Sequence, residues 1–325
     1  MPKDEPSIGA PPHAIAAVVI GRNEGERLIR CLRSLQGQAQ PLIYVDSGSS
    51  DGSAAAARAL GAEVVDLDLS QPFTAARARN AGLAVLGERA GCVQFVDGDC
   101  EVDTDWITTA AAFLQAHPQA AVVCGRRRER FPDASVYNRL CDAEWDTPLG
   151  EAKACGGDAL MRVAAVRAAG GYRGSLIAGE EPELCLRLRR DGWRIWRIDA
   201  EMTLHDAQMQ HFGQWWRRSR RAGHAFAEGA ALHGAGPERH WAAETRRALF
   251  WGTALPAGII LAGLMNPFLM IAILIYPAQF LRLARRMGYT QALFAVIGKF
   301  AEAAGAVEFY WRRWHGRARG ILEYK

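Results

Sequence analysis

The first hundred residues alternate short apolar runs with longer stretches of helical spacing. Each apolar run is followed by polar residues or glycine, as expected for a strand that ends in a loop. Strands that alternate with helices of this length predict βαβ units and a mostly parallel sheet. The expected strands cover 15–20, 42–45, 62–65 and 92–96, and the expected helices 24–36, 53–60 and 74–90.

Polar residues gather directly after three of these expected strands. Arg22-Asn23-Glu24 follows the first strand, Asp46 ends the second, and Asp97-Gly98-Asp99 follows the fourth. Ligands of open α/β sheets bind beyond the carboxyl ends of the strands. We therefore expect these three clusters to share one site.

The chemistry of the clusters suits a nucleoside diphosphate and a metal ion. Asp97 and Asp99, separated by one glycine, can reach one Mg²⁺ or Mn²⁺ ion and a neighbouring ribose, because hard cations prefer oxygen ligands. Such an ion neutralises charge that develops on a diphosphate leaving group. Asp46 is placed to accept hydrogen bonds from a pyrimidine base. Arg22, Asn23 and Glu24 suit the ribose-diphosphate region, although capping of the next helix is an alternative for the last two.

Further candidates lie in the second half of the chain. Glu181, in an acidic segment with a glycine before it, could deprotonate an acceptor hydroxyl as a general base. Its alternative role is to interact with the dipole of the helix that follows. Gly157 and Asp158 follow another glycine and could pass close to a bound sugar. His205 could be a third ligand of the metal or the diphosphate, or a structural histidine.

Charge and cysteine content narrow the function classes. The formal net charge is only +4, so no global basic field indicates a nucleic-acid partner. The seven cysteines include no CxxC pair, which favours a reducing compartment over a disulfide framework or a zinc knuckle. Residues 1–13 are polar with four prolines and predict a disordered lead-in that is not a signal peptide.

The chain changes character near residue 247. Residues 248–281 contain no charge, are interrupted by Asn266-Pro267, and have arginines on both sides. They predict two helices that form a hairpin with both basic flanks on the cytoplasmic side. Each half is short against the roughly 20 residues that cross a bilayer, so a pair lying in one leaflet is an alternative. A buried pair within the protein or a dimer is another. A further helix is expected at 292–314.

Taken together, these motifs resemble glycosyltransferase family 2, which has the GT-A fold. The resemblance covers about residues 14–225. Its motifs are similar to Val18–Glu24, Val45–Gly52, Arg79-Asn80-Ala81-Gly82, Val96–Asp99 and Glu180-Glu181 in this sequence.

The resemblance implies an inverting transfer of a sugar from a UDP- or GDP-sugar to a hydroxyl group, in cell-surface polysaccharide, exopolysaccharide or glycolipid synthesis. It implies an α/β, Rossmann-like catalytic domain at 14–230 and a helical, membrane-associating region at 231–325. The acceptor would be a glycan, a lipid-linked glycan or a lipid, and the enzyme would lie on the cytoplasmic face of the inner membrane. Glu181 would be the base and Asp99 would act through the metal. Asp97 would contact ribose or the ion. Asp46 would contact the nucleobase, and Arg79 would contact the phosphates.

The chain departs from the family pattern at one further motif, and three other protein classes can be compared with it. Processive members carry Gln-x-x-Arg-Trp, whereas this chain has Arg218 as the last residue of that motif, which argues against processive polymer synthesis. A nucleotidyltransferase would carry a glycine-rich phosphate loop with lysine after the first strand, and Gly21–Glu24 stands there instead. A Rossmann dehydrogenase would need GxGxxG at that point. A non-catalytic membrane scaffold that keeps the fold is the remaining alternative.

Overall fold

The computed structural model describes residues 14–316, so the expected lead-in at 1–13 lies outside the described residues. The chain forms two compact units. The first contains 14–175 and Glu180–Gln208, and the second contains Leu176–Gly179 and 209–316.

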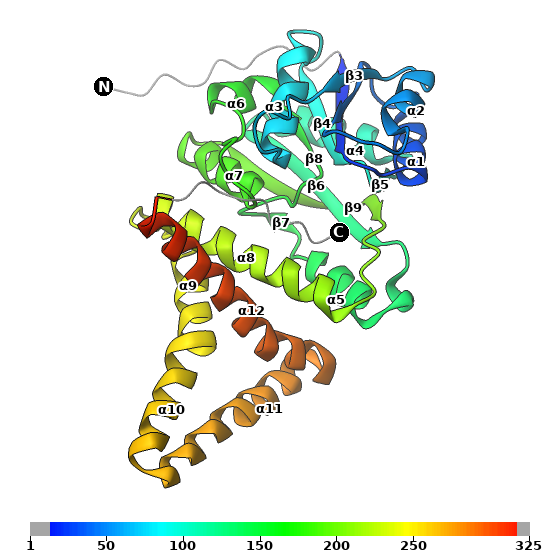
Figure 1. Ribbon diagram of the computed structural model, residues 1–325. Coiled ribbons are helices and arrows are strands. Elements are labelled where there is room, and N and C mark those ends of the chain that lie inside the picture. Colours follow the sequence, from blue (N-terminus) through cyan, green and yellow to red (C-terminus); the bar gives the residue numbers. More distant parts are fainter. Residues whose placement is uncertain (1–13, 317–325) are drawn as a thin grey trace, which may run out of the picture. The chain divides into compact units, whose positions relative to one another are not determined.

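The first unit is an α/β domain whose elements follow the expected order (Figure 1). All four strands and three helices expected in the first hundred residues are present, with ends that differ by a few residues. Its elements are β1 (Ile15–Gly21), α1 (Glu26–Leu35), β2 (Leu42–Asp46), α2 (Ser53–Ala59), β3 (Glu63–Asp66), α3 (Ala75–Leu86), β4 (Cys92–Asp97), β5 (Cys100–Val102), α4 (Trp106–Ala116), β6 (Ala120–Glu129), a 3₁₀ turn (Pro132–Ala134), α5 (Val136–Trp145), β7 (Gly150–Glu151), β8 (Ala159–Arg162), α6 (Val163–Ala168), α7 (Glu180–Arg190) and β9 (Arg194–His205).

One mixed sheet runs through this unit in the order β3-β2-β1-β4-β8-β6-β9-β5, with β7 paired to β9. The pairs among β1, β2, β3 and β4 are parallel, as the alternation of strands and helices predicts. Beyond β4 the pairing is mixed, because β8 is antiparallel to both β4 and β6 while β9 is parallel to β6. The sheet is therefore less parallel than expected.

The strands β1, β2 and β4 are buried on both faces, which explains their largely apolar sequences, whereas β3 at the edge of the sheet is exposed at both of its ends. The chain moves from β1 outward to β3 and then returns to β4 on the other side of β1. Right-handed crossovers consequently place α1 and α2 on one face and α3 on the other. This reversal beside β1 is the topological switch point at which α/β sheets bind their ligands.

The strand registers bring the polar clusters to one edge of the sheet. Gly21 at the end of β1 is paired with Asp46, and Ile20 is paired with Asp97. On the other side, Cys100 and Glu129 are both paired with His205. Segments that are far apart in the sequence, from Gly21 to His205, therefore end at the same edge of the sheet.

The second unit is helical, and two of its helices are long and apolar enough to cross a membrane. The expected turn at Asn266-Pro267 and the expected helix near 292–314 are both present. Where α8 and α12 cross, a Cβ on Gly223 would lie 1.9 Å from the carbonyl oxygen of Glu302, so only glycine allows this approach. The elements are α8 (Phe212–His233), α9 (Ala242–Leu249), a π-helical turn (Phe250–Ala254), α10 (Leu255–Met265), a 3₁₀ segment (Pro267–Leu274), α11 (Ile275–Met287) and α12 (Tyr289–Trp314).

Candidate active site

The end of β4 and the start of β8 form the centre of the site. Because β8 runs antiparallel to β4, Gly157 and Asp158 precede β8 beside Asp97. The backbone N–H of Asp97 donates a 3.1 Å hydrogen bond to the buried carboxylate of Asp158. A Cβ on Gly157 would lie 3.1 Å from Asp97 Oδ2 and 3.2 Å from a guanidinium nitrogen of Arg127. The absence of a side chain at 157 thus leaves room for charged groups around Asp97.

Arg79 links the centre of the site to the acidic helix α7. Its guanidinium is 2.7 Å from Asp97 Oδ1 and 2.6 Å from Glu180 Oε1, and its side chain is 2% exposed. Burial alone would lower the pKa of Arg79, but the charges of Asp97 and Glu180 outweigh it and raise the pKa. Burial raises the pKa of Asp97, although the charge of Arg79 opposes this. Arg79 is therefore a permanent cation in the site.

The rest of the arginine-asparagine-x-glycine motif fixes α3 in position. The side chain of Asn80 accepts a hydrogen bond from the N–H of Tyr172 and donates one to its carbonyl oxygen. A Cβ on Gly82 would lie 2.4 Å from Val18 Cγ1, so glycine lets the helix pack tightly on β1. These two contacts hold the Arg79 side chain at the end of the sheet.

Arg127 is a site residue that the sequence did not single out from its basic run. Its Nη2 atom is 2.6 Å from Asp158 Oδ2 and 3.7 Å from Asp97 Oδ2. Side chains alternate between the two faces along β6, so Arg127 points to the site while Arg128 makes an exposed ion pair. Alternation of side chains between two faces would have separated Arg127 from Arg128. This signal becomes informative only once residues 126–128 are known to lie in a strand.

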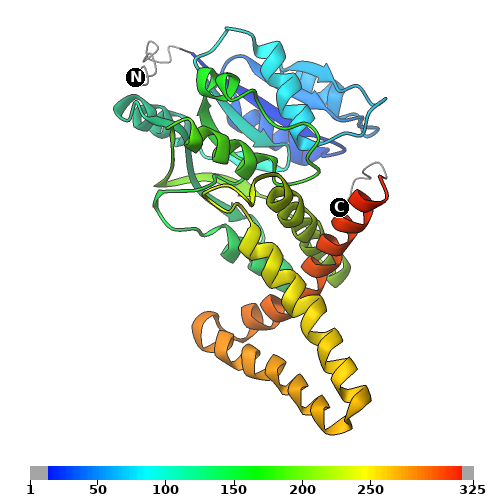
Figure 2. The same cartoon turned by 90° about the vertical axis from the view of Figure 1, so that its left-hand side faces the viewer.

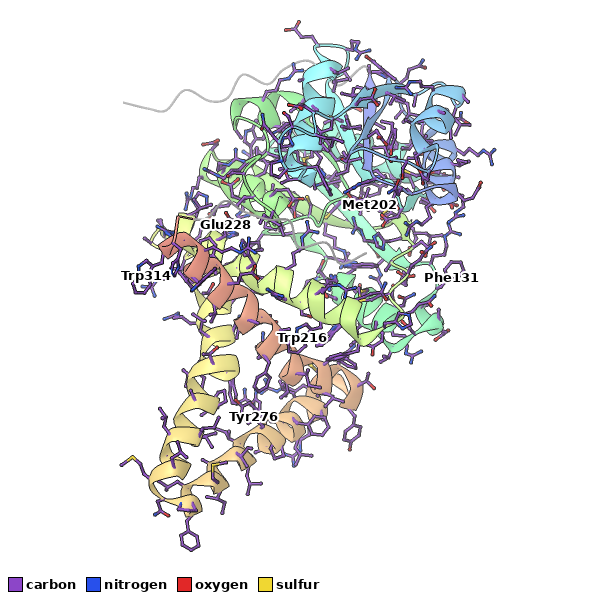
Figure 3. All side chains as sticks on the ribbon, viewed as in Figure 1. Phe131, Met202, Trp216, Glu228, Tyr276 and Trp314 are labelled. Carbon is purple, nitrogen blue, oxygen red and sulfur yellow. The ribbon has the colours of Figure 1, made fainter. Side chains whose placement is uncertain are left out.

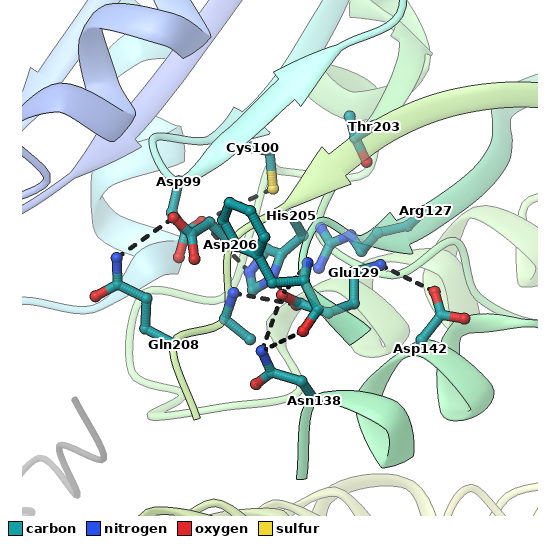
Figure 4. Close-up of polar contacts among 12 residues, drawn as sticks. Asp99, Cys100, Arg127, Glu129, Asn138, Asp142, Thr203, His205, Asp206 and Gln208 are labelled. Carbon is teal, nitrogen blue, oxygen red and sulfur yellow. Dashed lines mark hydrogen bonds and ion pairs between the residues drawn. The ribbon is translucent and has the colours of Figure 1, made fainter. Parts of the chain in front are cut away.

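Asp99, His205 and Glu129 form a second polar group (Figure 4). His205 Nε2 is 3.4 Å from Asp99 Oδ1, and its Nδ1 is 3.8 Å from Glu129 Oε2. Within residues 14–316, Nδ1 of His205 is buried without a hydrogen-bond partner. The backbone N–H of Asp206 donates to the carbonyl oxygen of Asp99, which ties the two strand ends together.

This group fits a hard divalent cation. Ligand atoms of Asp99, Cys100 and His205 all lie within 4.8 Å of one another. Burial raises the pKa of the Cys100 thiol well above its usual range, which disfavours the thiolate that a thiophilic ion requires. The available donors are therefore a carboxylate oxygen and an imidazole nitrogen, which suit Mn²⁺ or Mg²⁺ better than a thiophilic ion.

Glu129 belongs to a supporting network that the sequence analysis missed. Its carboxylate accepts hydrogen bonds from the Asn138 side chain and from the N–H of Ala207. The edge of Trp145 packs against His205, with ring centroids 4.7 Å apart. Nothing local in the sequence marks these residues, because the register between β6 and β9 brings Glu129 beside His205 while Asn138 and Trp145 reach them from α5.

The loops after β1 and β2 bind each other. Asn23 has a positive φ of 56°, which asparagine tolerates better than most residues, and its Oδ1 accepts the N–H of Ser50. Asp46 accepts hydrogen bonds from the Tyr44 hydroxyl and from the N–H groups of Gly48 and Ser49. In this structure both side chains therefore shape the two loops that form this side of the site.

Arg22 and Glu24 complete the first loop. The guanidinium of Arg22 lies 4.8 Å from the centre of the Phe73 ring, and its side chain is exposed. Glu24 Oε2 is 2.6 Å from Arg27. An open cavity of about 530 Å³ lies next to the site. One of its lining residues, Asp206, donates its backbone N–H to the carbonyl oxygen of Asp99. The cavity is lined by Glu24, Glu26, Arg27, Arg30, Arg130, Phe131, Asp206 and Gln208.

The two acids that begin α7 point in different directions. Glu180 reaches Arg79, as described above. Glu181 is 3% exposed, and its carboxylate accepts the N–H groups of Cys155 at 2.7 Å and Gly156 at 3.0 Å. The Cys155 thiol donates a further hydrogen bond to Oε1. Glu181 thus fastens the loop that leads to Gly157 and Asp158.

The mixed sheet with acidic residues at its carboxyl edge defines a GT-A fold. Residues 17–161 match the family described as Glycosyl transferase family 2. Over these residues the chain is similar to that family.

Solved structures share this fold at low sequence identity. The mannosyltransferase PcManGT from Pyrobaculum calidifontis, in complex with GDP-Man and Mn²⁺, has a TM-score of 0.66 and is 21% identical. The similarity covers 96% of this chain and 91% of that one. S. aureus TarS 1-349 has a TM-score of 0.50 at 15% identity, covering 93% and 92% of the two chains.

Two curated relatives match parts of the chain. The succinoglycan biosynthesis protein ExoA of Rhizobium meliloti is 27% identical over 199 residues, which are 56% of this chain and 60% of the relative. A TPR repeat-containing protein of Synechococcus elongatus is 30% identical over 133 residues, 41% of this chain and 32% of the relative. The chain thus spans less than two thirds of the length of either relative.

Proposed function

We propose that this protein transfers a sugar from a UDP- or GDP-sugar to a hydroxyl acceptor, with inversion and with a divalent metal ion. The observation that carries this proposal is the meeting of Asp97, Asp99 and His205 with the buried Arg79 and the partly buried Arg127 at one sheet edge. The acids and the imidazole suit a metal ion, and Arg79 and Arg127 suit a diphosphate. The Mn²⁺ and GDP-Man in the PcManGT complex support the same assignment.

Asp99 and His205 would hold the ion, and Asp97 would contact it or the ribose. Mn²⁺ or Mg²⁺ would supply Lewis-acid stabilisation of the departing nucleoside diphosphate. Arg79 would then exchange part of its interaction with Asp97 for a donor phosphate. Asp158 would keep Arg127 in place for the same purpose, because its carboxylate is the nearest acid to that guanidinium.

The loops after β1 and β2 would receive the nucleoside. We infer that Asp46 holds the turn of Gly48 and Ser49 against the base, in addition to any direct contact with it. Arg22, Asn23 and Glu24 would border the ribose and diphosphate. Gly157 would let the sugar approach the arginines, since any side chain there would occupy that space.

Glu181 would accept the proton of the acceptor hydroxyl. Its Oε2 atom accepts only the N–H of Gly156 among the described residues, so a second lone pair is available there. Glu180 is the less suitable base because Arg79 holds it in an ion pair. Inversion follows if the hydroxyl attacks in a single displacement from the face opposite the leaving diphosphate.

The variants Glu181→Gln and Glu180→Gln separate these roles. Loss of the base should lower transfer at least about 100-fold while donor affinity stays within about twofold. Glu180→Gln should instead weaken donor binding, because Arg79 loses the ion pair that holds its guanidinium in position. If Glu181→Gln transfers sugar at the normal rate, Glu181 is not the base. If the Glu181→Gln variant only binds the donor more weakly, the role of Glu181 is to hold the loop at Cys155 and Gly156.

A screen of nucleotide sugars by nucleotide release, with Mn²⁺ or Mg²⁺, tests the activity itself. Asp99→Ala should abolish release, whereas Asp133→Ala, whose side chain is 96% exposed, should not change it. Full turnover in EDTA would contradict the metal dependence. Release of pyrophosphate instead of UDP or GDP would identify a nucleotidyltransferase, and no turnover with any donor would favour a scaffold.

For the biological setting, we propose polysaccharide or glycolipid synthesis at the cytoplasmic face of the inner membrane. The similarity to a succinoglycan biosynthesis protein supports a glycan, lipid-linked or lipid acceptor. The apolar segment at 248–281 supports contact with membrane lipids, and the arginines on both of its flanks favour the cytoplasmic side.

A further inference from the structure

The apolar part of the second unit folds as an open helical hairpin. We call residues 250–281 the insertion hairpin. In Figures 1 and 2 its two legs, α10 and α11, diverge from the turn at Asn266. Around this apex large apolar side chains are exposed, with Met265 89%, Phe268 87% and Leu264 78% accessible. Exposed apolar clusters of this kind mark interaction surfaces.

The polar groups of the apex bind each other. The side-chain oxygen of Asn266 accepts the N–H of Phe268 at 3.1 Å, and the Asn266 carbonyl oxygen accepts the N–H of Leu269. The Asn266 N–H donates to Ala262, and Pro267 has no N–H. Each backbone N–H from Asn266 to Leu269 therefore has a partner within the turn, as a turn surrounded by hydrocarbon requires.

Aromatic residues join the two legs nearer their bases. Tyr276 lies between the legs (Figure 3) and donates a 2.6 Å hydrogen bond from its hydroxyl to the carbonyl oxygen of Trp251. The rings are 6.0 Å apart. Tryptophan and tyrosine are typical of the boundary between hydrocarbon and headgroups. Beyond them lie the arginines, at positions 246, 247, 282, 285 and 286.

The legs are too short to reach the opposite headgroups from this aromatic level. Fourteen residues separate Trp251 from Met265, which is about 21 Å at 1.5 Å per residue. The second leg, from Pro267 to Tyr276, is shorter, about 17 Å, even though its first eight residues form a 3₁₀ segment with a rise near 2 Å. The hydrocarbon core is about 30 Å thick. Divergence of the legs reduces their depth further.

We propose that the insertion hairpin enters an anionic phospholipid bilayer from one side and ends within the hydrocarbon, without crossing it. The apolar apex takes the acyl chains, Trp251 and Tyr276 take the interface, and the arginines take anionic headgroups. This charge complementarity favours lipid over a second protein chain as the partner. The inference rests on the proposed membrane location but not on the transfer reaction.

Site-directed fluorescence on the full-length protein tests the insertion. All seven native cysteines are buried, so Met265→Cys can carry an environment-sensitive label, with Thr290→Cys as an exposed control outside the hairpin. The protein is added to preformed vesicles that contain one part phosphatidylglycerol to two parts phosphatidylcholine. The label at 265 should shift to the blue and be quenched by lipids with a quencher deep in the acyl chain. An aqueous quencher should not reach it from outside or from the vesicle lumen, whereas the label at 290 should be quenched from outside.

The outcomes separate this inference from the location on which it rests. If a quencher trapped in the lumen reaches the label at 265, the hairpin spans the bilayer and the inference is wrong. If vesicles recruit no protein, the proposed membrane location fails as well. If the label is already shielded without lipid, a protein surface covers the apex instead. Arg285→Gln should weaken recruitment about fivefold at low salt, and the effect should vanish with phosphatidylcholine alone.

Discussion

Neutralising Asp158 should destabilise the protein much more than neutralising an exposed acid. Its carboxylate has 0% exposure and three partners, namely the N–H of Asp97, the hydroxyl of Thr203 and the guanidinium of Arg127. In Asp158→Asn the shape is kept and the amide oxygen can still accept one hydrogen bond. The main loss is the 2.6 Å ion pair with Arg127.

The size of the effect follows from what remains around Arg127. Removing one partner of a buried ion pair typically costs about 3–5 kcal/mol, because the other charge stays desolvated. Asp97 is still 3.7 Å from the same guanidinium and compensates in part, so we expect the lower end, about 3 kcal/mol. For a domain of this size that corresponds to a melting temperature about 6–12 °C lower.

Urea and thermal unfolding, followed by circular dichroism in mild detergent, measure this difference. The matched control is Asp66→Asn, which removes an ion pair with Arg58 whose side chains are 72% and 53% exposed. Exposed pairs contribute about 0–1 kcal/mol, so the control should scarcely change the stability. Equal losses in the two variants, or a loss below about 1 kcal/mol in Asp158→Asn, would refute the assignment of a structural ion pair to Asp158.

Three further outcomes follow from the same structure. Gly157→Ala places a methyl group 3.1 Å from Asp97 Oδ2 and should lower nucleotide release at least roughly tenfold with little change in melting temperature; unchanged release would show that this space is not used. Gly223→Ala forces its Cβ against the Glu302 carbonyl and should cost about 3 kcal/mol or more in thermal unfolding, so a neutral result would rule out the close crossing of α8 and α12. Burial raises the pKa of Cys185 to about 11, so its thiol should resist Ellman's reagent at pH 8 and react only after denaturation. The stability that its bound proton contributes is complete below the unfolded pKa near 8.5 and is lost as the pH rises through the folded value.

The parallel half of the fold could be predicted because its signals are local. Strands such as β1 and β4 are largely apolar and end in a change to polar residues or glycine. Once the strands are parallel and adjacent, the positions of Asp46 and Asp97 at one edge follow without further information. The hairpin turn was equally local, because Asn266-Pro267 interrupts an uncharged segment.

The other half of the site depends on pairings between distant segments. His205 meets Glu129 and Asp99 only because β9 lies between β6 and β5 in a specific register. Asp158 meets Arg127 only because β8 runs antiparallel between β4 and β6. No periodicity in the sequence encodes such neighbours, so the ion pair could not be inferred from the arginine run in 126–128.

The two acids at the start of α7 show the same limit at the scale of one residue. Successive side chains of a helix point about 100° apart, so adjacent glutamates cannot do the same work. In the structure Glu180 turns to the cation Arg79, while Glu181 turns to the N–H groups of Cys155 and Gly156. The sequence motif therefore locates the two glutamates but does not show which one is the base and which one pairs with Arg79. The division depends on which neighbour each carboxylate meets, and so the two isosteric glutamine variants, compared for transfer and for donor binding, are the experiment that assigns the base.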